Sequence, residues 1–216
     1  MRIIAGSLRG RRLVAPPGLA TRPTTDRVRE AWFSMLGPLE GTALDLYAGT
    51  GALGFEALSR GAEHVVMVES GKAAQKAILQ NADALGVRQR VTLLGSTVET
   101  CRSAVGRLAP FELILTDPPW THIDEAERAL ALLLNAKLLT PTGRLVLGHP
   151  KKRSVSLRDD SGLVATKSRN WGDSAATFYE PAAEDPAAPS ADSPADPTSD
   201  PTANPDGQLG GDSDQP

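Results

Sequence analysis

The chain has 216 residues, 40% of them hydrophobic, a formal net charge of −3 and a single cysteine, Cys101. This length suffices for one α/β domain, a single cysteine excludes an intrachain disulfide, and no apolar run is long enough to cross a membrane. We therefore expect a cytoplasmic protein that acts as a monomer, with no membrane contact and no metal site. Cys101 is expected to be a small buried residue rather than a nucleophile.

The charge is unevenly distributed along the chain. Residues 181–216 contain eight acidic residues, eight prolines and no Lys or Arg, which is the composition of a disordered acidic tail. Residues 1–180 therefore carry 23 basic and 18 acidic residues, a balance of +5, and seven of the arginines fall in residues 1–35. We expect an Arg-rich segment over residues 1–36 that faces a phosphate backbone, followed by an α/β domain over residues 37–180.

The Arg-rich segment is predicted to form a small hairpin followed by a helix. Ile3-Ile4 and Leu13-Val14 suit short extended pieces joined by a glycine-containing turn. Thr24 or Thr25 can cap a helix that continues to Leu36. The arginines expected to line an RNA-binding surface are Arg9, Arg11, Arg12, Arg22, Arg27 and Arg29.

The stretch from Thr42 to Glu69 has the pattern of a strand, a glycine-rich turn, a helix and a second strand. Its apolar runs Ala43–Tyr47 and Val65–Val68 are too short for helices and predict buried strands, whereas residues 53–59 show helical periodicity. A glycine-rich turn in this context indicates a site for a nucleotide-like ligand.

The turn itself carries Gly49, Gly51 and Gly54 in the spacing G-x-G-x-x-G. Glycines permit positive φ and let a ligand approach the backbone, while the helix behind them presents unpaired N–H groups. Glu69, about twenty positions later, stands where such folds bind ribose hydroxyls. Asp45 would repel a pyrophosphate and suits instead an amine-bearing tail, such as the amino acid half of S-adenosylmethionine. The alternative is that Asp45 is a turn residue and the glycines serve packing alone.

Helices and strands continue to alternate beyond this unit, which predicts a mostly parallel sheet with helices on both faces. Further helices are predicted over Lys72–Leu85, Ser96–Leu108 and Ala126–Leu139, and further strands over Val91–Leu94, Phe111–Thr116 and Gly143–Leu147. Residues 162–167 and 175–179 suit a closing hairpin. The residues of the first of these helices that are expected to face inward are Ala73, Ala77, Ile78 and Leu85.

A second motif, Asp117-Pro118-Pro119-Trp120, follows the predicted strand Phe111–Thr116. The two prolines fix the backbone and remove two N–H donors, which leaves carbonyl acceptors beside the Asp117 carboxylate. These acceptors suit the exocyclic amine of a nucleobase, with Trp120 stacked on its ring. The lone pair of such an amine is delocalised into the ring of the base. Acceptors that favour a tetrahedral nitrogen would localise this lone pair and direct it, so catalysis here would consist of positioning and electrostatics.

These motifs resemble a known family. DLYAGTGALGFEALSRGA with DPPW resembles the class I S-adenosylmethionine-dependent methyltransferases that act on amino groups, and RIIAGSLRGRRL with RPTTDRVREAWFSML is similar to the bacterial small-subunit (16S) rRNA guanine-N2 methyltransferases. The resemblance covers residues 2 to about 180. It implies a Rossmann-like α/β fold: a mostly parallel seven-stranded sheet with helices on both faces, a closing antiparallel hairpin and a small N-terminal extension. It also implies S-adenosyl-L-methionine as cofactor and 16S rRNA, or a small-subunit assembly particle, as partner.

The resemblance further assigns site residues. Asp45 and the glycines would hold the methionine end of the cofactor, Glu69 its ribose, and Ser96 its adenine. The residues assigned to the cofactor are Asp45, Tyr47, Gly49, Gly51, Glu69 and Ser96. Those assigned to the target amine are Asp117, Pro118, Pro119 and Trp120. Three positions depart from the family pattern. Trp120 replaces the usual Tyr or Phe, and Gly148-His149 stands where relatives tend to have glutamate. Gly95-Ser96-Thr97 stands where an acidic or amide residue often lies near the adenine.

Two other functions remain open at the level of sequence. The first is a methyltransferase that acts on DNA adenine N6 or on a protein glutamine, because the Asp-Pro-Pro-aromatic motif requires only a planar amine. The second is a non-catalytic RNA-binding protein of the same fold. The Arg-rich segment argues against the first, and the presence of Asp45, Glu69 and Asp117 argues against the second.

Overall fold

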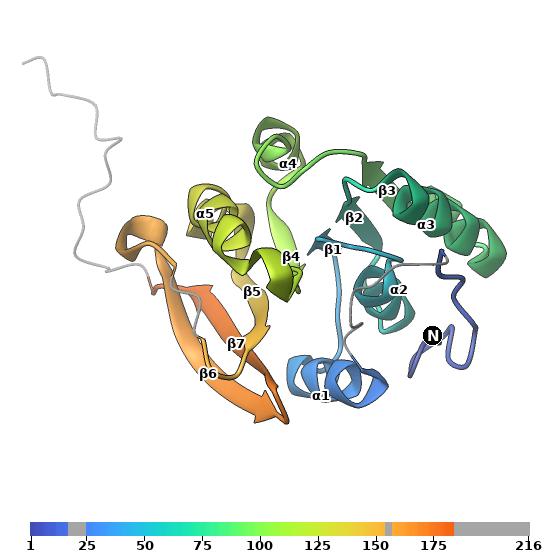
Figure 1. Cartoon of the computed structure of the whole chain (residues 1–216), viewed down its shortest axis with the longest axis horizontal. Helices are drawn as coiled ribbons and strands as arrows, with labels where there is room; N and C mark the ends of the chain where they lie inside the picture. Colours follow the sequence, from blue (N-terminus) through green and yellow to red (C-terminus); the bar gives the residue numbers. More distant parts are fainter. Residues whose placement is uncertain (17–24, 154–156, 184–216) are drawn as a thin grey trace, which may run out of the picture. The chain divides into compact units, whose positions relative to one another are not determined.

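Seven strands form one sheet in the computed structural model of the chain, which describes residues 1–16, 25–153 and 157–183 (Figure 1). The strands are β1 Thr42–Leu46, β2 His64–Val68, β3 Val91–Leu94, β4 Phe111–Thr116, β5 Leu139–Pro150, β6 Leu163–Trp171 and β7 Ser174–Pro181. Their order is β3-β2-β1-β4-β5-β7-β6. Strands β1 to β5 pair in parallel, and β7 is antiparallel to both β5 and β6, so the predicted sheet and closing hairpin are confirmed.

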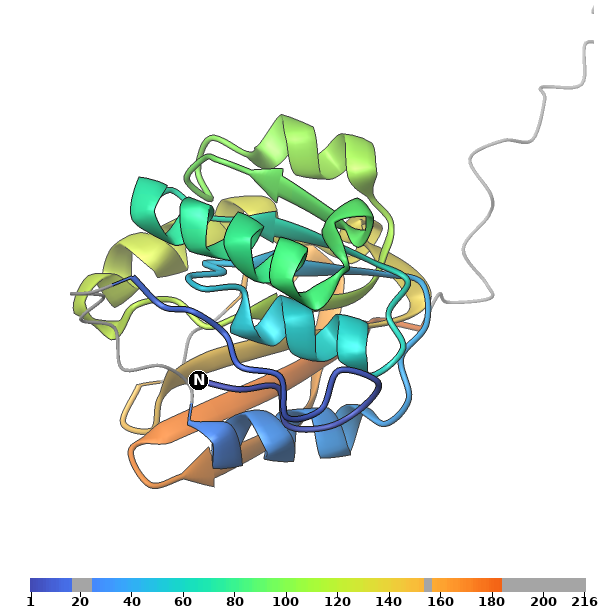
Figure 2. The same ribbon diagram turned by 90° about the vertical axis from the view of Figure 1, so that its right-hand side faces the viewer.

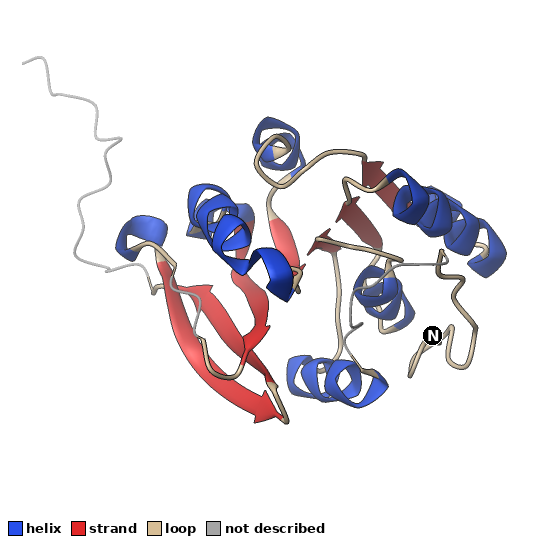
Figure 3. Ribbon diagram, in the orientation of Figure 1, coloured by secondary structure: helices blue, strands red, loops and turns tan. Residues whose placement is uncertain are grey.

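Helices cover both faces of the sheet, as Figure 3 shows. They are α1 Asp26–Leu36, α2 Ala52–Ser59, α3 Lys72–Leu85, α4 Arg102–Leu108 and α5 Ile123–Leu133. On one face Phe33, Phe55 and Ile78 from α1, α2 and α3 join one core cluster. On the other face Val105 and Leu130 from α4 and α5 join a second cluster. Within the described part of the chain, no helix is both long enough and apolar enough to span a membrane.

The N-terminal segment lies alongside α2 and α3 (Figure 2). Its predicted hairpin is present as a single antiparallel bridge between Arg2 and Arg12, in which the Ile3 amide donates to the Arg11 carbonyl at 3.0 Å. Helix α1 begins after Thr25, whose hydroxyl accepts from the Val28 amide at 3.3 Å, so Thr25 is the helix cap. Residues 1–182 form one compact unit. From residue 184 onward the acidic tail predicted from the sequence lies outside the described residues.

Two predicted helix boundaries were wrong. The helix predicted to begin at Ser96 begins at Arg102, because the hydroxyls of Ser96 and Thr97 hydrogen bond to that of Thr100, at 2.7 and 3.0 Å, and hold a turn instead. The helix predicted over Ala126–Leu139 runs from Ile123 to Leu133. Its end is set by Asn135, whose amide donates to the Leu133 carbonyl at 3.0 Å.

Two smaller predictions also need correction. Ala73 is exposed, and Ala74 takes the inward position with Ala77 and Ile78, so the buried face of α3 starts one residue later than expected. Tyr47, predicted as the last strand residue, lies in the turn after β1 with φ of 60°. A positive φ is uncommon for a residue with a side chain, and it redirects the chain towards the glycine turn.

Candidate active site at the carboxyl edge of the sheet

The strand register brings the two sequence motifs to one edge of the sheet. Leu46 at the end of β1 pairs with Val68 of β2 on one side and with Thr116 of β4 on the other. Glu69 and Asp117 each follow directly on one of these partners. They therefore lie on either side of the turn that leaves β1. Neighbouring parallel strands are about 4.8 Å apart, so both carboxylates are within reach of one small ligand at this edge.

Asp45 lies at the centre of this edge and is fully buried. Its Oδ2 accepts from the Gly54 amide at 2.8 Å, whereas its Oδ1 has no hydrogen-bond partner among the described residues. Burial raises the pKa of Asp45 to about 8; the Gly54 amide opposes this shift, and the charges of Asp117 and Glu69 add to it. Asp45, Asp117 and Glu69 thus gather at the ends of β1, β4 and β2, and a positively charged ligand at this edge would favour the ionised form of Asp45.

The raised pKa of Asp45 predicts a pH dependence of stability. Native Asp45 keeps its proton up to about pH 8, whereas the unfolded residue loses it near its ordinary value of 3.8. Over this window the unfolded state binds fewer protons than the native state, so the free energy of unfolding should fall as the pH rises towards 8. Asparagine at position 45 cannot titrate. In urea denaturation between pH 5 and pH 8, we expect a shallower pH dependence for Asp45→Asn than for the wild type; parallel dependences would contradict the assignment.

The three glycines of the turn have different roles. Gly49 has φ of 56°, and a Cβ built there would meet no described atom within 4 Å, so its backbone faces open space. Gly51 has φ of 81°, and a Cβ there would lie 2.6 Å from the Phe55 ring. At Gly54 a Cβ would lie 2.5 Å from the Met67 methyl group. Gly51 and Gly54 are therefore required by packing, and Gly49 is the position at which a ligand can approach the bare backbone.

Glu69 connects the glycine turn to the start of α3. Its Oε2 accepts from the Gly49 amide at 2.8 Å and its Oε1 from the Gly71 amide at 2.7 Å. Each carboxylate oxygen has a second lone pair, so Glu69 can still accept from ribose hydroxyls while it holds the turn.

Two further residues assigned to the cofactor are at the same edge. The Tyr47 ring packs against the core on the α4 side, and its hydroxyl is buried with no hydrogen-bond partner among the described residues. Burial raises the pKa of Tyr47, and the charge of Glu99 adds to the shift. Ser96 is half-buried in the loop after β3, where its hydroxyl is already hydrogen bonded to that of Thr100 at 2.7 Å.

The Asp117–Trp120 motif leaves β4 beside the end of β5. Thr116 pairs with Leu147, so Asp117 lies next to Gly148. A Cβ at Gly148 would lie 2.5 Å from Asp117 Oδ1 and 2.7 Å from Trp32 Cη2. The absence of a side chain at Gly148 thus makes room for the Asp117 carboxylate between the sheet and α1. Trp32 and Gly148 could not be predicted as neighbours of Asp117 from the sequence, because both are distant from it in the chain.

The remaining residues of this motif are partly accessible. Pro118 is buried, whereas Pro119 and Trp120 are half-buried. Trp120 begins a short 3₁₀ turn, Trp120–His122, that leads directly into α5. The two prolines therefore fix the path of the chain between β4 and α5.

His149 has a structural place in the fold. It is buried, its Nδ1 is 2.7 Å from the Arg153 carbonyl oxygen, and its Nε2 is 3.1 Å from the Thr177 hydroxyl. Both ring nitrogens are thus occupied by neighbours within the domain. This arrangement agrees with a histidine that holds the turn after β5.

The N-terminal arginines are not equivalent. Arg9, Arg11, Arg12 and Arg27 are exposed or partly exposed, and Arg11 donates to the Ala84 carbonyl at the end of α3. Arg22 lies outside the described residues.

The expectation that Arg29 lines an RNA-binding surface was wrong, because only 1% of Arg29 is exposed. Its guanidinium donates to the Arg2 carbonyl at 2.6 Å and to Asp26 at 2.9 Å, and its Nε lies 3.7 Å from Glu56. Burial lowers the pKa of Arg29, and the Glu56 and Asp26 charges oppose that shift. Arg29 therefore stabilises the interior of the domain.

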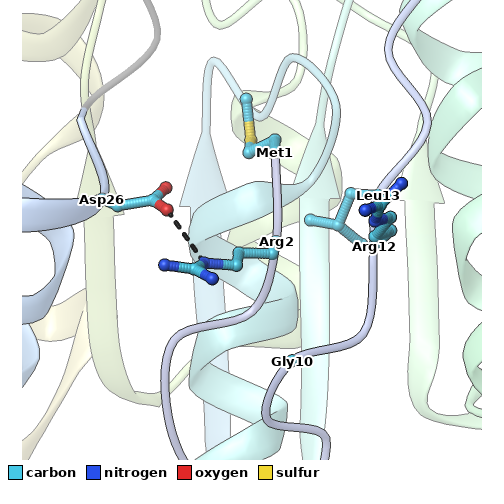
Figure 4. Close-up of a pocket in the computed structure, with 6 residues that line it drawn as sticks. All are labelled: Met1, Arg2, Gly10, Arg12, Leu13 and Asp26. Atoms are coloured by element: carbon cyan, nitrogen blue, oxygen red, sulfur yellow. Dashed lines mark ion pairs between the residues drawn. The ribbon is translucent and has the colours of Figure 1, made fainter.

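Figure 4 shows a hollow between the hairpin and the start of α1. Its volume is about 480 Å³, and it is lined by Met1, Arg2, Gly10, Arg12, Leu13 and Asp26. Arg2 pairs with Asp26 across it at 3.4 Å. Met1 connects the hollow to the glycine turn, because the Thr50 hydroxyl is 3.6 Å from the Met1 sulfur. The hollow that Arg2 and Arg12 line thus reaches the candidate cofactor turn.

The strand order, the glycine turn and the acidic edge together define a class I methyltransferase fold. The chain belongs to the family described as Conserved hypothetical protein 95, whose sequence model matches residues 1–180.

Similar proteins include the putative rRNA methyltransferase YlbH of Bacillus subtilis, which is 36% identical over 83% of this chain and 98% of its own length. Ribosomal RNA small subunit methyltransferase D of Haemophilus influenzae is 32% identical over 77% of this chain and 88% of its own length. The solved structure of a hypothetical protein of Thermus thermophilus, TTHA0928, has a TM-score of 0.67 and 27% identity, and covers 83% of this chain and 99% of its own.

Proposed function

We propose that this protein transfers a methyl group from S-adenosyl-L-methionine to the exocyclic N2 amine of a guanine in 16S rRNA of the small ribosomal subunit. The observation that carries the proposal is the register of β2, β1 and β4, which brings Glu69, the glycine turn and Asp117 to one edge. The name of the Haemophilus influenzae relative, Ribosomal RNA small subunit methyltransferase D, supports the same substrate class.

The residues of the edge fit the cofactor. Its methionine end carries a cationic amine and a sulfonium, and a cation bound there would favour the ionised form of Asp45, against the burial that raises its pKa. Gly49 offers bare backbone in open space, and Asp45 Oδ1 is a buried acceptor for which the described residues provide no donor. Glu69 would bind the ribose hydroxyls, and the loop that contains Ser96 would flank the adenine. When bound, S-adenosylmethionine supplies an electrophilic methyl group.

The protein's own part in the reaction is to hold the acceptor amine. Asp117 and the Pro118 carbonyl would each accept one hydrogen of the amine, and Trp120 would stack on the base. Two acceptors on one nitrogen favour a tetrahedral geometry, which localises the lone pair that attacks the methyl group. Asp117 does this from beside Gly148, where its carboxylate occupies the space that a side chain at position 148 would need.

The choice of guanine N2 and of rRNA depends on the N-terminal segment. Adenine, cytosine and guanine all present an exocyclic amine, so the Asp-Pro-Pro-Trp motif does not select among them. The resemblance of residues 2–36 to the rRNA enzymes favours guanine N2, and the accessible Arg9, Arg12 and Arg27 can bind phosphates that flank an unstacked base. We propose residues 1–36 as the RNA-facing part of the domain and residues 37–180 as its catalytic part.

This proposal predicts a specific modified nucleoside. With radiolabelled S-adenosylmethionine, label should enter the rRNA of small ribosomal subunits from cells that lack the protein, and nucleoside digestion should yield N2-methylguanosine. Naked 16S rRNA and assembled particles should be tested side by side, since either could be the substrate. Label in duplex DNA as N6-methyladenine would contradict the RNA assignment, and RNA binding without any label would favour the non-catalytic alternative.

A further inference from the structure

A buried asparagine on α3 joins the N-terminal segment to the glycine turn. Asn81 is 1% exposed. Its Oδ1 accepts from the Val14 amide at 2.7 Å, and its Nδ2 donates to the Val14 carbonyl at 3.0 Å and to the Thr50 carbonyl at 3.1 Å. These are contacts to backbone groups 67 and 31 residues away in the chain, so Asn81 does not serve the local structure of its own helix.

The Thr50 carbonyl is part of the peptide group that opens α2. The N–H of the same peptide group, on Gly51, donates to the Ala48 carbonyl at 2.8 Å. Asn81 and Ala48 therefore hold this peptide plane from its two ends. Gly51 is the N-terminal cap of α2, with its carbonyl accepting from the Phe55 amide at 2.8 Å. The orientation of the Thr50–Gly51 peptide thus fixes the direction in which the turn enters the helix.

The remaining contacts of the turn show how much depends on Asn81. Glu69 holds the Gly49 amide at 2.8 Å, and Met1 contacts the Thr50 side chain. Gly49 and Gly51 have positive φ, and glycine confers little stiffness of its own. The Thr50 carbonyl accepts a hydrogen bond from Asn81 Nδ2. The same nitrogen also donates to the Val14 carbonyl in the N-terminal segment.

We infer that Asn81 is a positioning residue for the cofactor turn, and that it makes the N-terminal segment, residues 1–14, a structural part of the cofactor site. The inference deepens the proposed function, on which it rests. One side chain binds the backbone of both Val14 and Thr50. A well-ordered N-terminal segment therefore stabilises the cofactor turn, and a well-ordered turn stabilises the segment. Linkage of this kind acts in both directions, so a segment held by RNA would favour the turn that binds the cofactor.

The test compares two asparagine substitutions of the same chemistry. Asn81→Ser removes the donor to Thr50 together with the two hydrogen bonds to Val14, and it keeps a small polar side chain at the position. The matched control, Asn135→Ser, removes a donor to the Leu133 carbonyl on α5, away from the turn. In the ligand-free protein, Asn81→Ser should raise the hydrogen-exchange rate of the Gly51 amide and of the Ile3 and Leu13 amides by at least about tenfold, since about tenfold is the effect of a single lost hydrogen bond and Asn81 makes three. Asn135→Ser should leave these rates unchanged.

Titration with S-adenosylhomocysteine, the demethylated product, supplies a second measurement. Asn81→Ser should weaken its binding about tenfold and raise the KM for S-adenosylmethionine by a similar factor, with kcat at saturation unchanged. A merely structural asparagine would lower the melting temperature but leave binding unaltered well below it. Wild-type affinity together with unchanged Gly51 exchange would overturn the inference. Should the wild type bind neither compound, the proposed function fails, and the exchange rates still decide whether Asn81 holds the turn.

Discussion

Replacement of Asp117 by asparagine should lower kcat about 10²- to 10³-fold, the usual effect of removing one preorganised group that stabilises a transition state. Asparagine keeps the shape of the side chain, so it fits the same space beside Gly148. The substitution removes the negative charge that accepts a hydrogen of the acceptor amine and so localises the lone pair on its nitrogen. Affinity for S-adenosylmethionine should stay within about twofold of the wild type, because Asp45 and Glu69 remain in place.

The measurement is single-turnover methylation of small-subunit rRNA at saturating cofactor, together with calorimetric titration of the cofactor. Asp160→Asn is a suitable control, because Asp160 is an exposed residue paired with Arg158, away from the sheet edge. Near-normal turnover of Asp117→Asn would refute the assigned role. A loss of cofactor affinity equal to the loss of turnover would instead assign Asp117 to the cofactor.

Much of the sheet could be predicted because its signals are local. The strand Phe111–Thr116 and the helix Lys72–Leu85 have the predicted boundaries, since an apolar run fixes the first and Gly86, with φ of 72°, ends the second. Parallel pairing then brings the ends of β1, β2 and β4 together. The candidate site follows from these two facts, which is why Asp45, Glu69 and Asp117 converge as expected.

The parts that could not be predicted depend on contacts between distant residues. In the sequence, Arg29 is one of seven arginines in residues 1–35. Only the folded chain shows that it is buried beside Glu56 of α2. Asn81 and Ser59 look like ordinary helix residues, yet both hold the backbone of the N-terminal segment. Similarly, Gly51 cannot be told from Gly49 by its spacing. Their different roles depend on the position of the Phe55 ring.

Loss of the Glu56 carboxylate should destabilise the fold strongly. It is fully buried, and its carboxylate accepts from the Ile4 amide at 2.8 Å, the Ala5 amide at 3.1 Å and the Arg60 Nε at 2.7 Å. Arg29 lies 3.7 Å away on the other side. The N-terminal segment, α1 and α2 therefore meet at one carboxylate. A buried charge that loses its partner cannot recover hydration, so the cost of the change exceeds that of an exposed ion pair.

Glu56→Gln should lower the free energy of unfolding by about 3 kcal/mol, the lower end of the range for breaking a buried pair, because Asp26 still neutralises part of the Arg29 charge. Urea denaturation measures this loss. Glu127→Gln makes the same chemical change in the more exposed pair with Arg153, and it should cost far less. The N-terminal segment should also detach more readily in Glu56→Gln, which limited trypsin digestion at Arg9, Arg11 and Arg12 would detect. Equal losses in the two variants, with equal trypsin resistance, would show that the Glu56 carboxylate does not hold the segment in place.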